Sequence, residues 1–248
     1  MCIRDRTMRE KTVFITGGAK RIGASMANYF HERNYKVVFH YNKSEKEAEN
    51  LSRKLNEKEA DSCFTIQSDF SSQESIESTV NEFYKVSKEI DVLINNASSF
   101  YPTPLQNATE EQWNDLLDTN ITTPLFLIKG FKEGLKRTKG SVINISDSLA
   151  PRGIKNFSLY SSAKGALETL TKSLAKELAP EVRINAVAPG IILWPENGEI
   201  DEEEKNNILK KVDLGRAGNP MDISSAVYFL TGANYITGQT LRVDGGRS

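Results

Sequence analysis

Cysteine, histidine and long apolar runs are scarce in this chain of 248 residues, and each scarcity excludes a class of protein. Cys2 and Cys63 are too few for a disulfide framework, which favours a reducing compartment and a cytoplasmic location. His31 and His40 have no His/Cys cluster around them, so no metal site is expected, and His40 is expected to be structural. No apolar run reaches the roughly 18 residues that a membrane span needs.

The composition that remains is that of an ordinary soluble globular protein. It is 38% hydrophobic, and a net charge of −1 gives no reason to expect a nucleic acid or an anionic membrane as partner. Residues 1–8 lack the apolar core of a signal peptide and match no fold element. We therefore expect a disordered or non-native tail there, with Met8 as an alternative initiator, and one domain over residues 9–248.

Short β-prone runs alternate with amphipathic helical stretches along that domain, without a repeat or a break in composition. This alternation predicts a single-domain α/β fold with a doubly wound parallel sheet, the Rossmann fold. The strands are expected at 11–16, 36–40, 62–67, 91–95, 142–145, 182–187 and 240–243, and the main helices at 22–30, 44–60, 72–88, 109–128, 159–174 and 221–230. Residues 191–215 are acidic and lack periodicity, so they are predicted to form a lid.

A glycine-rich turn, residues 17–23 (Gly-Gly-Ala-Lys-Arg-Ile-Gly), follows the first expected strand and precedes a helix. Glycine lets the backbone approach a pyrophosphate, and the helix N-terminus attracts its charge, so this context is typical of a dinucleotide site. The spacing departs from G-x-G-x-x-G, and a glycine turn without a ligand is the alternative. Its place at the first strand-to-helix junction favours ligand binding.

The end of the second strand lacks the carboxylate that an NAD-specific site uses to hold the ribose 2′-hydroxyl. No acidic residue lies between positions 37 and 44. Lys43 and Ser44, with Lys20 and Arg21 from the first turn, supply cations and a hydroxyl that suit a 2′-phosphate. Lys43 could instead be a solvated loop residue, but the missing carboxylate favours NADPH.

Tyr160 and Lys164 are four residues apart in a predicted helix and therefore share one of its faces. A free phenol has a pKa of about 10, and an ammonium one turn away is expected to lower the pKa of Tyr160 toward a useful range. Asp147, just after the strand at 142–145, brings a second proton-carrying group to this helix. A lone Tyr-x-x-x-Lys is a weak motif and needs support from the rest of the chain.

Two further features lie between these motifs. The loop at 96–104 follows the fourth strand and should face a bound nicotinamide, because ligands bind beyond the carboxyl ends of parallel strands. Thr109 and Gln112 form a capping-box pattern at the start of the helix expected over 109–128. Asn120 lies in the middle of that helix, where an interhelical hydrogen bond is the ordinary explanation for an amide.

Five signals occur in one order, and together they resemble the short-chain dehydrogenase/reductase family over residues 9–248. They are the turn at 16–23, Asn95-Asn96-Ala97, Asn120, Tyr160-x-x-x-Lys164 and Pro189-Gly190. The resemblance implies a nicotinamide cofactor, Tyr160 as proton donor, Lys164 holding the ribose and lowering the pKa of Tyr160, Asn120 in a proton relay, and often a homotetramer. With the phosphate-site residues, the expected cofactor-binding set is Gly17, Lys20, Arg21, Ile22, Gly23, His40, Asn42, Lys43, Ser44, Asp69, Phe70, Asn96, Ala97, Ser98, Tyr160, Lys164, Pro189 and Gly190.

The chain departs from the family at Asp147, where most members have a serine that hydrogen-bonds a substrate carbonyl. A carboxylate beside a developing alkoxide would oppose carbonyl reduction. A carboxylic acid could instead protonate, directly or through water, a ring nitrogen as hydride reaches the neighbouring carbon of a C=N bond. Asp147 therefore favours an imine-type substrate. The alternative is a shift of one residue that places Ser146 or Ser148 in the site.

This change, together with residues 19–23 and 95–105, resembles the pteridine reductase branch of the family. The resemblance implies a pterin sandwiched between the nicotinamide and Phe100, with Arg21 at the phosphate and the pterin and Ser98 beside the cofactor. Phe100 could instead anchor its loop in the core, because aromatic residues bury readily. Trp194, in the predicted lid, is a further candidate for contacting the substrate.

The sequence thus predicts NADPH-dependent reduction of a dihydropterin or dihydrofolate, and of oxidised pterin as a further substrate. The alternatives are a generic carbonyl reductase, for example of 3-oxoacyl thioesters or sugars, and a catalytically silent NADPH-binding regulator. The expected catalytic set is Asp147, Tyr160, Lys164 and Asn120, and the expected substrate-binding set is Arg21, Ser98, Phe100, Asp147, Tyr160 and Trp194.

Overall fold

A seven-stranded parallel sheet runs through the computed structural model, which describes residues 10–194 and 201–247. Its order is β3-β2-β1-β4-β5-β6-β7, so β1 pairs with both β2 and β4. The predicted doubly wound α/β fold is confirmed, while the predicted tail at 1–8 lies outside the described residues. The strands are β1 (Lys11–Ile15), β2 (Tyr35–Tyr41), β3 (Cys63–Gln67), β4 (Val92–Asn95), β5 (Ser141–Ile145), β6 (Arg183–Pro189) and β7 (Thr240–Val243).

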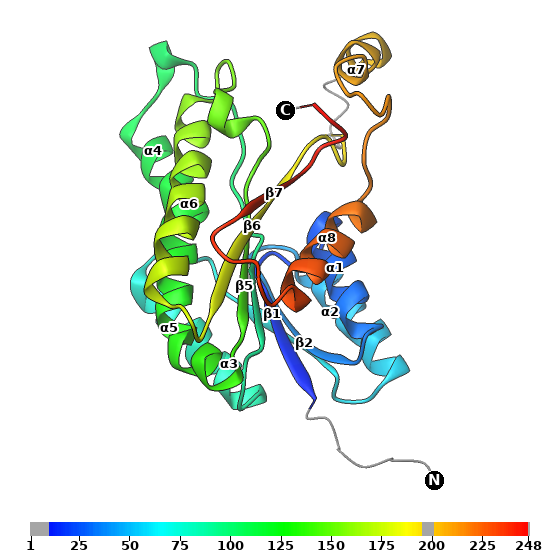
Figure 1. The fold of residues 1–248 in the computed structure, drawn as a ribbon, viewed down its shortest axis with the longest axis vertical. Coiled ribbons are helices and arrows are strands. Elements are labelled where there is room, and N and C mark those ends of the chain that lie inside the picture. Colours follow the sequence, from blue (N-terminus) through cyan, green and yellow to red (C-terminus); the bar gives the residue numbers. More distant parts are fainter. Residues whose placement is uncertain (1–9, 195–200, 248) are drawn as a thin grey trace.

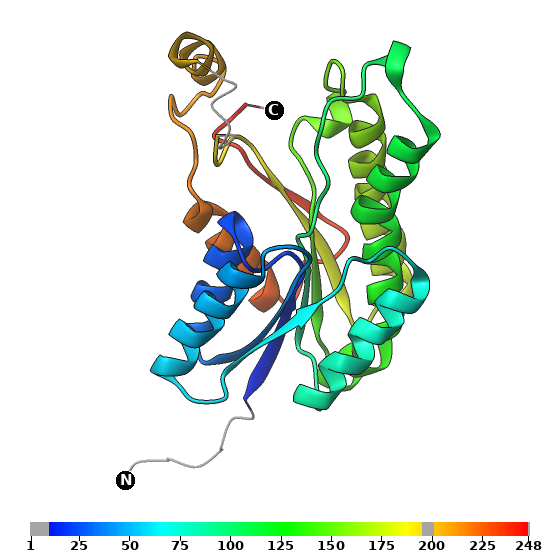
Figure 2. The ribbon, with the colours of Figure 1, turned by 180° about the vertical axis from the view of Figure 1, so that it is seen from behind.

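Helices cover both faces of this sheet (Figure 1). One layer consists of α1 (Arg21–His31), α2 (Glu45–Lys58) and α8 (Pro220–Gly232). The other consists of α3 (Gln73–Val86), α5 (Thr123–Thr138) and α6 (Ser158–Glu177), with α4 (Glu110–Leu117) packed against α6. Figure 2 shows the same sandwich from behind.

The core divides into two clusters because the strands are buried on both faces. Along β1, Val13 and Ile15 face the layer of α1 and α8, while Phe14 faces the layer of α3 and α5. All three side chains are fully buried. Alternate residues of a strand point to opposite faces, so a parallel strand covered on both sides reads as a continuous apolar run.

Two segments differ from the sequence predictions. The helix predicted over 109–128 is interrupted by a π-helical turn, Asp118–Thr122, between α4 and α5. The predicted lid is not without regular structure, since it contains α7 (Glu202–Leu209). Asp201 caps α7 by accepting a hydrogen bond from the Glu204 amide. Three glutamates in the first turn of α7 interact favourably with the positive end of the helix dipole.

Other boundaries agree closely with the predictions. The capping box of Thr109 and Gln112 opens α4 as expected, and Ser72 caps α3 in the same way. None of the helices in residues 10–194 and 201–247 is long and apolar enough to cross a membrane.

Candidate active site

The glycine turn connects β1 to α1 and needs glycine at several positions. Gly17 has a φ of +62°, a conformation that side chains disfavour. A Cβ at Gly23, in the first turn of α1, would collide with the carbonyl oxygen of Gly17. The turn therefore stays tight, and it brings the open N-terminus of α1 to the carboxyl edge of the sheet, as binding of a pyrophosphate requires.

His40 holds this turn from β2. Its Nδ1 accepts a hydrogen bond from the Gly17 amide at 3.1 Å, and its Nε2 lies 2.9 Å from the Ser68 carbonyl oxygen, to which it donates. Burial lowers the pKa of His40 to about 4, so the ring is neutral, and it lies against Phe70 at 4.0 Å between centroids. These bonds give His40 a structural part in the turn, and its predicted contact with a cofactor stays a prediction.

Asn96 ties the end of β4 to the same turn. Its side-chain amide donates to the carbonyl oxygens of Thr16 and Gly17, at 2.9 and 3.0 Å. The Thr16 hydroxyl in turn accepts hydrogen bonds from the amides of Asn96 and Ala97. These bonds hold the first and fourth strand ends in one arrangement without any ligand.

A pocket of about 470 Å³ opens between these strand ends. Its lining includes ten of the predicted cofactor-binding residues: Gly17, Lys20, His40, Asn42, Lys43, Ser44, Asp69, Phe70, Ala97 and Ser98. It also includes residues that the sequence did not single out, among them Asp115 and Thr119 of the segment around α4. Their signal was absent from the sequence because they belong to a helix face that becomes part of the pocket only through tertiary packing.

The other predicted cofactor-binding residues, Tyr160 and Lys164 among them, are not part of the lining of this pocket. Ile22 packs against the core cluster of α1, so its role there is structural. Gly190 closes β6 against the end of β7, where a Cβ would approach the Cα of Asp244 to 2.6 Å. The exposed carboxylate of Asp69 accepts a hydrogen bond from the Ser71 amide, and this bond lowers the pKa of Asp69.

Asp147 and Tyr160 form the centre of the candidate active site. The Tyr160 hydroxyl donates to Oδ2 of Asp147 at 3.0 Å. The other oxygen, Oδ1, accepts the amides of Leu149 and Ala150, which fixes the carboxylate in one orientation. The pair lies where β5 ends beside α6, as the sequence predicted.

The alternative in which a serine takes the place of Asp147 does not agree with the structure. Ser146 donates its hydroxyl to Oε1 of Glu168 at 2.9 Å, within α6. Ser148 is fully buried, and its hydroxyl has no partner among the described residues. The side chain that reaches Tyr160 is therefore that of Asp147.

The expected lowering of the Tyr160 pKa is wrong for the protein without a ligand. Burial and the neighbouring Asp147 carboxylate raise the pKa of Tyr160 far above its usual value. The Lys164 ammonium donates to the Ile145 carbonyl oxygen at 2.8 Å and lies 5.9 Å from the centre of the Tyr160 ring. The Asp147 carboxylate contacts the Tyr160 hydroxyl directly, and the phenol keeps its proton at neutral pH.

Asn120 lies in the π-helical turn and holds the loop at 96–104. It accepts a hydrogen bond from the Ser98 hydroxyl at 2.7 Å and donates to the carbonyl oxygens of Ser99 and Leu116. π-helical turns are often found at functional sites. The widened turn lets one amide serve both the loop and the helix.

Phe100 is more than half exposed, at 57%, so the alternative that it anchors its loop in the core is wrong. Its ring stacks on Phe157 at 4.6 Å between centroids and meets the edge of Tyr160 at 4.8 Å. Phe157 was not predicted. The sequence could have indicated Phe157 by its position three residues before Tyr160, at the N-cap of α6. Its contact with Phe100 depends on the fold.

The segment after β6 lies beside the glycine turn. The Arg21 guanidinium donates to the carbonyl oxygens of Leu193 and Trp194, both at 3.4 Å. Trp194 is half-buried there. Its predicted contact with a substrate stays a prediction.

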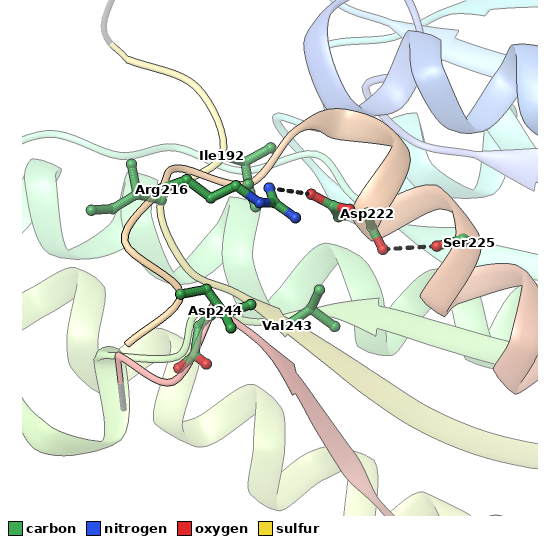
Figure 3. Close-up of a pocket in the computed structure, with 10 residues that line it drawn as sticks. Ile192, Arg216, Asp222, Ser225, Val243 and Asp244 are labelled. Carbon is green, nitrogen blue, oxygen red and sulfur yellow. Dashed lines mark hydrogen bonds and ion pairs between the residues drawn. The ribbon is translucent and has the colours of Figure 1, made fainter. Parts of the chain in front are cut away.

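A smaller pocket, of about 200 Å³, lies between this segment, α8 and the end of β7 (Figure 3). Arg216 points to Asp222 across it, with 3.2 Å between Nη1 and Oδ2. Val243 and Asp244 line it from β7 and the turn that follows.

Arg247, near the end of the chain, was not among the residues predicted from the sequence. Burial lowers its pKa, and the nearby carboxylates of Asp147 and Asp244 oppose that shift.

Within residues 10–194 and 201–247, no group of three His, Cys, Asp or Glu side chains is placed to hold a metal ion. The chemistry that the described residues do present is a phenol, a carboxylate and a buried ammonium beside an exposed aromatic ring. These groups can deliver and accept protons next to a flat ligand.

Comparison with known proteins gives matches along nearly the whole chain. A family model described as enoyl-(acyl carrier protein) reductase matches residues 17–248. Pteridine reductase 1 of Leishmania tarentolae is 33% identical over 276 residues, covering 94% of this chain and 95% of that protein. The 3-oxoacyl-[acyl-carrier-protein] reductase FabG of Staphylococcus aureus is also 33% identical, covering 95% and 97%. FabG of Staphylococcus epidermidis is 32% identical, covering 95% and 98%.

Proposed function

The chain belongs to the short-chain dehydrogenase/reductase family, and on that premise we propose that it is an NADPH-dependent reductase of pterins. Its substrate is a dihydropterin or dihydrofolate, reduced at a C=N bond to the tetrahydro form. Tyr160 and Asp147 supply the proton that the ring nitrogen gains.

The hydrogen bond between Tyr160 and Asp147 carries this proposal. A carbonyl reductase needs donors around an oxygen that becomes negative, and a carboxylate there is repulsive. A ring nitrogen needs a proton source instead. The 3.0 Å bond makes the phenol and the carboxylate one pair, in which the phenol holds the proton that the ring nitrogen would gain and a proton from solvent would restore it.

The residues of the pocket fit the proposed cofactor. Any side chain at Gly23 would collide with the Gly17 carbonyl oxygen. Because glycine has no side chain, the turn at the N-terminus of α1 stays tight and a pyrophosphate can approach its backbone. Lys20, Lys43 and Ser44 line the pocket at the end of β2, where a 2′-phosphate would need cations and a hydroxyl. NADPH would supply a hydride when bound, and Lys164 and Tyr160 are the residues that we propose to hold its ribose and nicotinamide.

Phe100 supports a flat heterocyclic substrate. Its exposed ring stands at the edge of Tyr160 and is backed by Phe157, so it offers a firm surface for stacking. Ser98, on the same loop as Phe100, is fixed by its hydrogen bond to Asn120 and presents a polar group near Phe100. Arg21 donates to the carbonyl oxygens of Leu193 and Trp194, in the segment after β6.

The second candidate is reduction of a 3-oxoacyl thioester. It is favoured by the Staphylococcus reductases, which match this chain at the same identity as the pteridine reductase. The two candidates differ in what they require of Asp147. Pterin reduction depends on its carboxyl group, whereas carbonyl reduction would be left intact or improved by Asp147→Ser.

The test is NADPH consumption with dihydrobiopterin, dihydromonapterin and dihydrofolate, measured beside acetoacetyl thioesters. We expect turnover of at least one pterin or folate, loss of that turnover in Asp147→Asn, and unchanged NADPH affinity in that variant. Turnover of the thioester alone, retained in Asp147→Ser, would establish the second candidate. Near-normal pterin turnover in Asp147→Asn would show that the role given to Asp147 is wrong.

A further inference from the structure

A carboxylate that the sequence pattern did not reveal stands beside the predicted 2′-phosphate site. Lys20, from the glycine turn, forms an ion pair with Glu47 of α2, with 2.7 Å between Nζ and Oε1. This contact lowers the pKa of Glu47. The side chains are 46% and 48% exposed, so the pair lies at the rim of the pocket and not beneath it.

The place of this pair matters because Lys20 lines the pocket together with Lys43 and Ser44. Glu47 follows the end of β2 by six residues, so it falls outside the 37–44 window in which a carboxylate was sought. It lies in the first turn of α2, and α2 starts beside Ser44, whose hydroxyl makes no capping bond to the helix. The fold thus returns a carboxylate to a site that the strand itself leaves without one.

A 2′-phosphate and Glu47 compete for the same ammonium. A phosphate monoester carries about −1.5 to −2 charges at neutral pH. A phosphate that binds Lys20 lies close to Glu47 as well, because the Lys20 ammonium is 2.7 Å from the Glu47 carboxylate. This separation is well within the roughly 10 Å over which salt screens charges, so the phosphate and Glu47 repel each other. A cofactor with a 2′-hydroxyl meets no such repulsion and needs no cation.

We propose that Glu47 is a specificity-determining residue that weakens the preference for NADPH over NADH by holding Lys20 and repelling the 2′-phosphate. Glu47 acts through Lys20 and need not touch the reacting atoms. The inference rests on the proposed use of a nicotinamide cofactor but not on the pterin substrate. A protein that reduces only thioesters, or none of the substrates, tests it equally well.

The experiment measures the dissociation constants of NADPH and NADH by fluorescence titration, with no second substrate present. Two ligands that differ only in the 2′-phosphate separate the proposed effect from a general change of the fold. In Glu47→Gln we expect the dissociation constant of NADPH to fall by about two- to fivefold, as for an exposed ion pair, and that of NADH to stay unchanged. Glu47→Asp, which keeps the charge, should return most of the wild-type ratio.

Glu49→Gln is the matched control, since it removes an exposed charge from the same helix two residues away. Lys20→Met should weaken NADPH binding, and Glu47→Gln added to it should do no more than Glu49→Gln does. An equal gain from Glu47→Gln and Glu49→Gln would overturn the proposal. So would an equal gain for NADPH and NADH, a full gain in the Lys20→Met background, or failure of wild type to bind either cofactor.

Discussion

Two parts of the candidate site are built differently. The catalytic wall, formed by Phe100, Asp147, Phe157, Tyr160 and Lys164, holds its polar groups by hydrogen bonds of 2.8 to 3.3 Å and leaves Tyr160 and Lys164 only 5% and 2% exposed. The lid wall, formed by residues 190–194, 212–218 and 243–247, meets the glycine turn through two bonds of 3.4 Å from Arg21. Its Leu214 is 68% exposed.

This difference separates the chemistry from substrate selection. Groups that transfer protons must be held within a fraction of an ångström of a productive geometry, and packing supplies that rigidity. The lid wall has Ile192 and Val212 buried, but its bonds to Arg21 are exposed. Exposed bonds open at a lower free energy, so this contact can adapt to substrates of different shape.

The largest effect that this comparison predicts is that of Tyr160→Phe. The variant keeps the ring that meets Phe100 but removes the hydroxyl that donates to Asp147. Loss of a general acid costs about 10²- to 10⁴-fold in kcat, while the dissociation constant of NADPH should change little. The measurement is steady-state NADPH oxidation together with a binding titration.

Tyr101→Phe is the control for Tyr160→Phe. Its hydroxyl also donates to a carboxylate, Asp115, at 2.8 Å, but it stands outside the catalytic wall. We expect its kcat to stay within a few-fold of wild type. Equal losses in the two variants would mean that the catalytic wall is no more important for chemistry than its surroundings.

The second effect is a dependence of stability on pH that comes from Lys164. Burial lowers the pKa of Lys164 from 10.5 to about 8, against the attraction of Asp147. Between these two values the unfolded chain binds more protons than the folded one, so the free energy of unfolding rises with pH. The gap corresponds to on the order of 3 kcal/mol, most of which is recovered between pH 8 and 10.5.

Urea unfolding at pH 7.5 and 9.5 tests this effect. Because other groups also titrate in that range, the quantity to follow is the difference between wild type and Lys164→Met. Wild type should gain on that variant as the pH rises. Lys210→Met, which removes an exposed lysine from the lid side, should run parallel to wild type. A constant difference between wild type and Lys164→Met would show that the ammonium is not desolvated in the folded protein.

A third, smaller effect concerns the aromatic part of the catalytic wall. Phe157→Ala removes the ring on which Phe100 stacks, so Phe100 loses its fixed position beside Tyr160. An aromatic pair contributes about 0.5–1.5 kcal/mol, which corresponds to a rise of about 2- to 12-fold in the KM for a pterin, with a smaller change in kcat. Phe229→Ala, which removes an exposed ring from α8, should change neither constant. A fall in kcat alone would place Phe157 in proton transfer and not in stacking.

The sequence predicted the parts of the molecule whose pattern is local. β4 reads as an apolar run because both of its faces are covered, and α4 begins at a capping box that two side chains and two amides complete by themselves. α7 was missed because none of its side chains is buried, so it has no apolar face to produce a period.

The missed features of the site depend on contacts between distant residues. The π-helical turn around Asn120 forms where that amide meets the loop of Ser98 and Ser99, about twenty positions earlier in the chain. The sign of the Tyr160 pKa shift depends on which charged group contacts the hydroxyl. Sequence spacing indicated Lys164, whereas in the fold the Asp147 carboxylate makes this contact. No local pattern encodes such distances.

The smallest effect is expected on the lid wall, for Trp194→Ala. The bonds from Arg21 go to the backbone carbonyls of Leu193 and Trp194, so they survive removal of the indole. Only contacts of the side chain with a substrate are lost, and these reach the part of the substrate that lies beyond the ring. We expect the KM for dihydrofolate, which has a long substituent, to rise by a few-fold, and the KM for a small pterin and both kcat values to change by less than about twofold, as for a partly exposed site. A large fall in kcat with the small pterin would mean that the lid wall positions the reacting ring, and the division between the two walls would then be wrong.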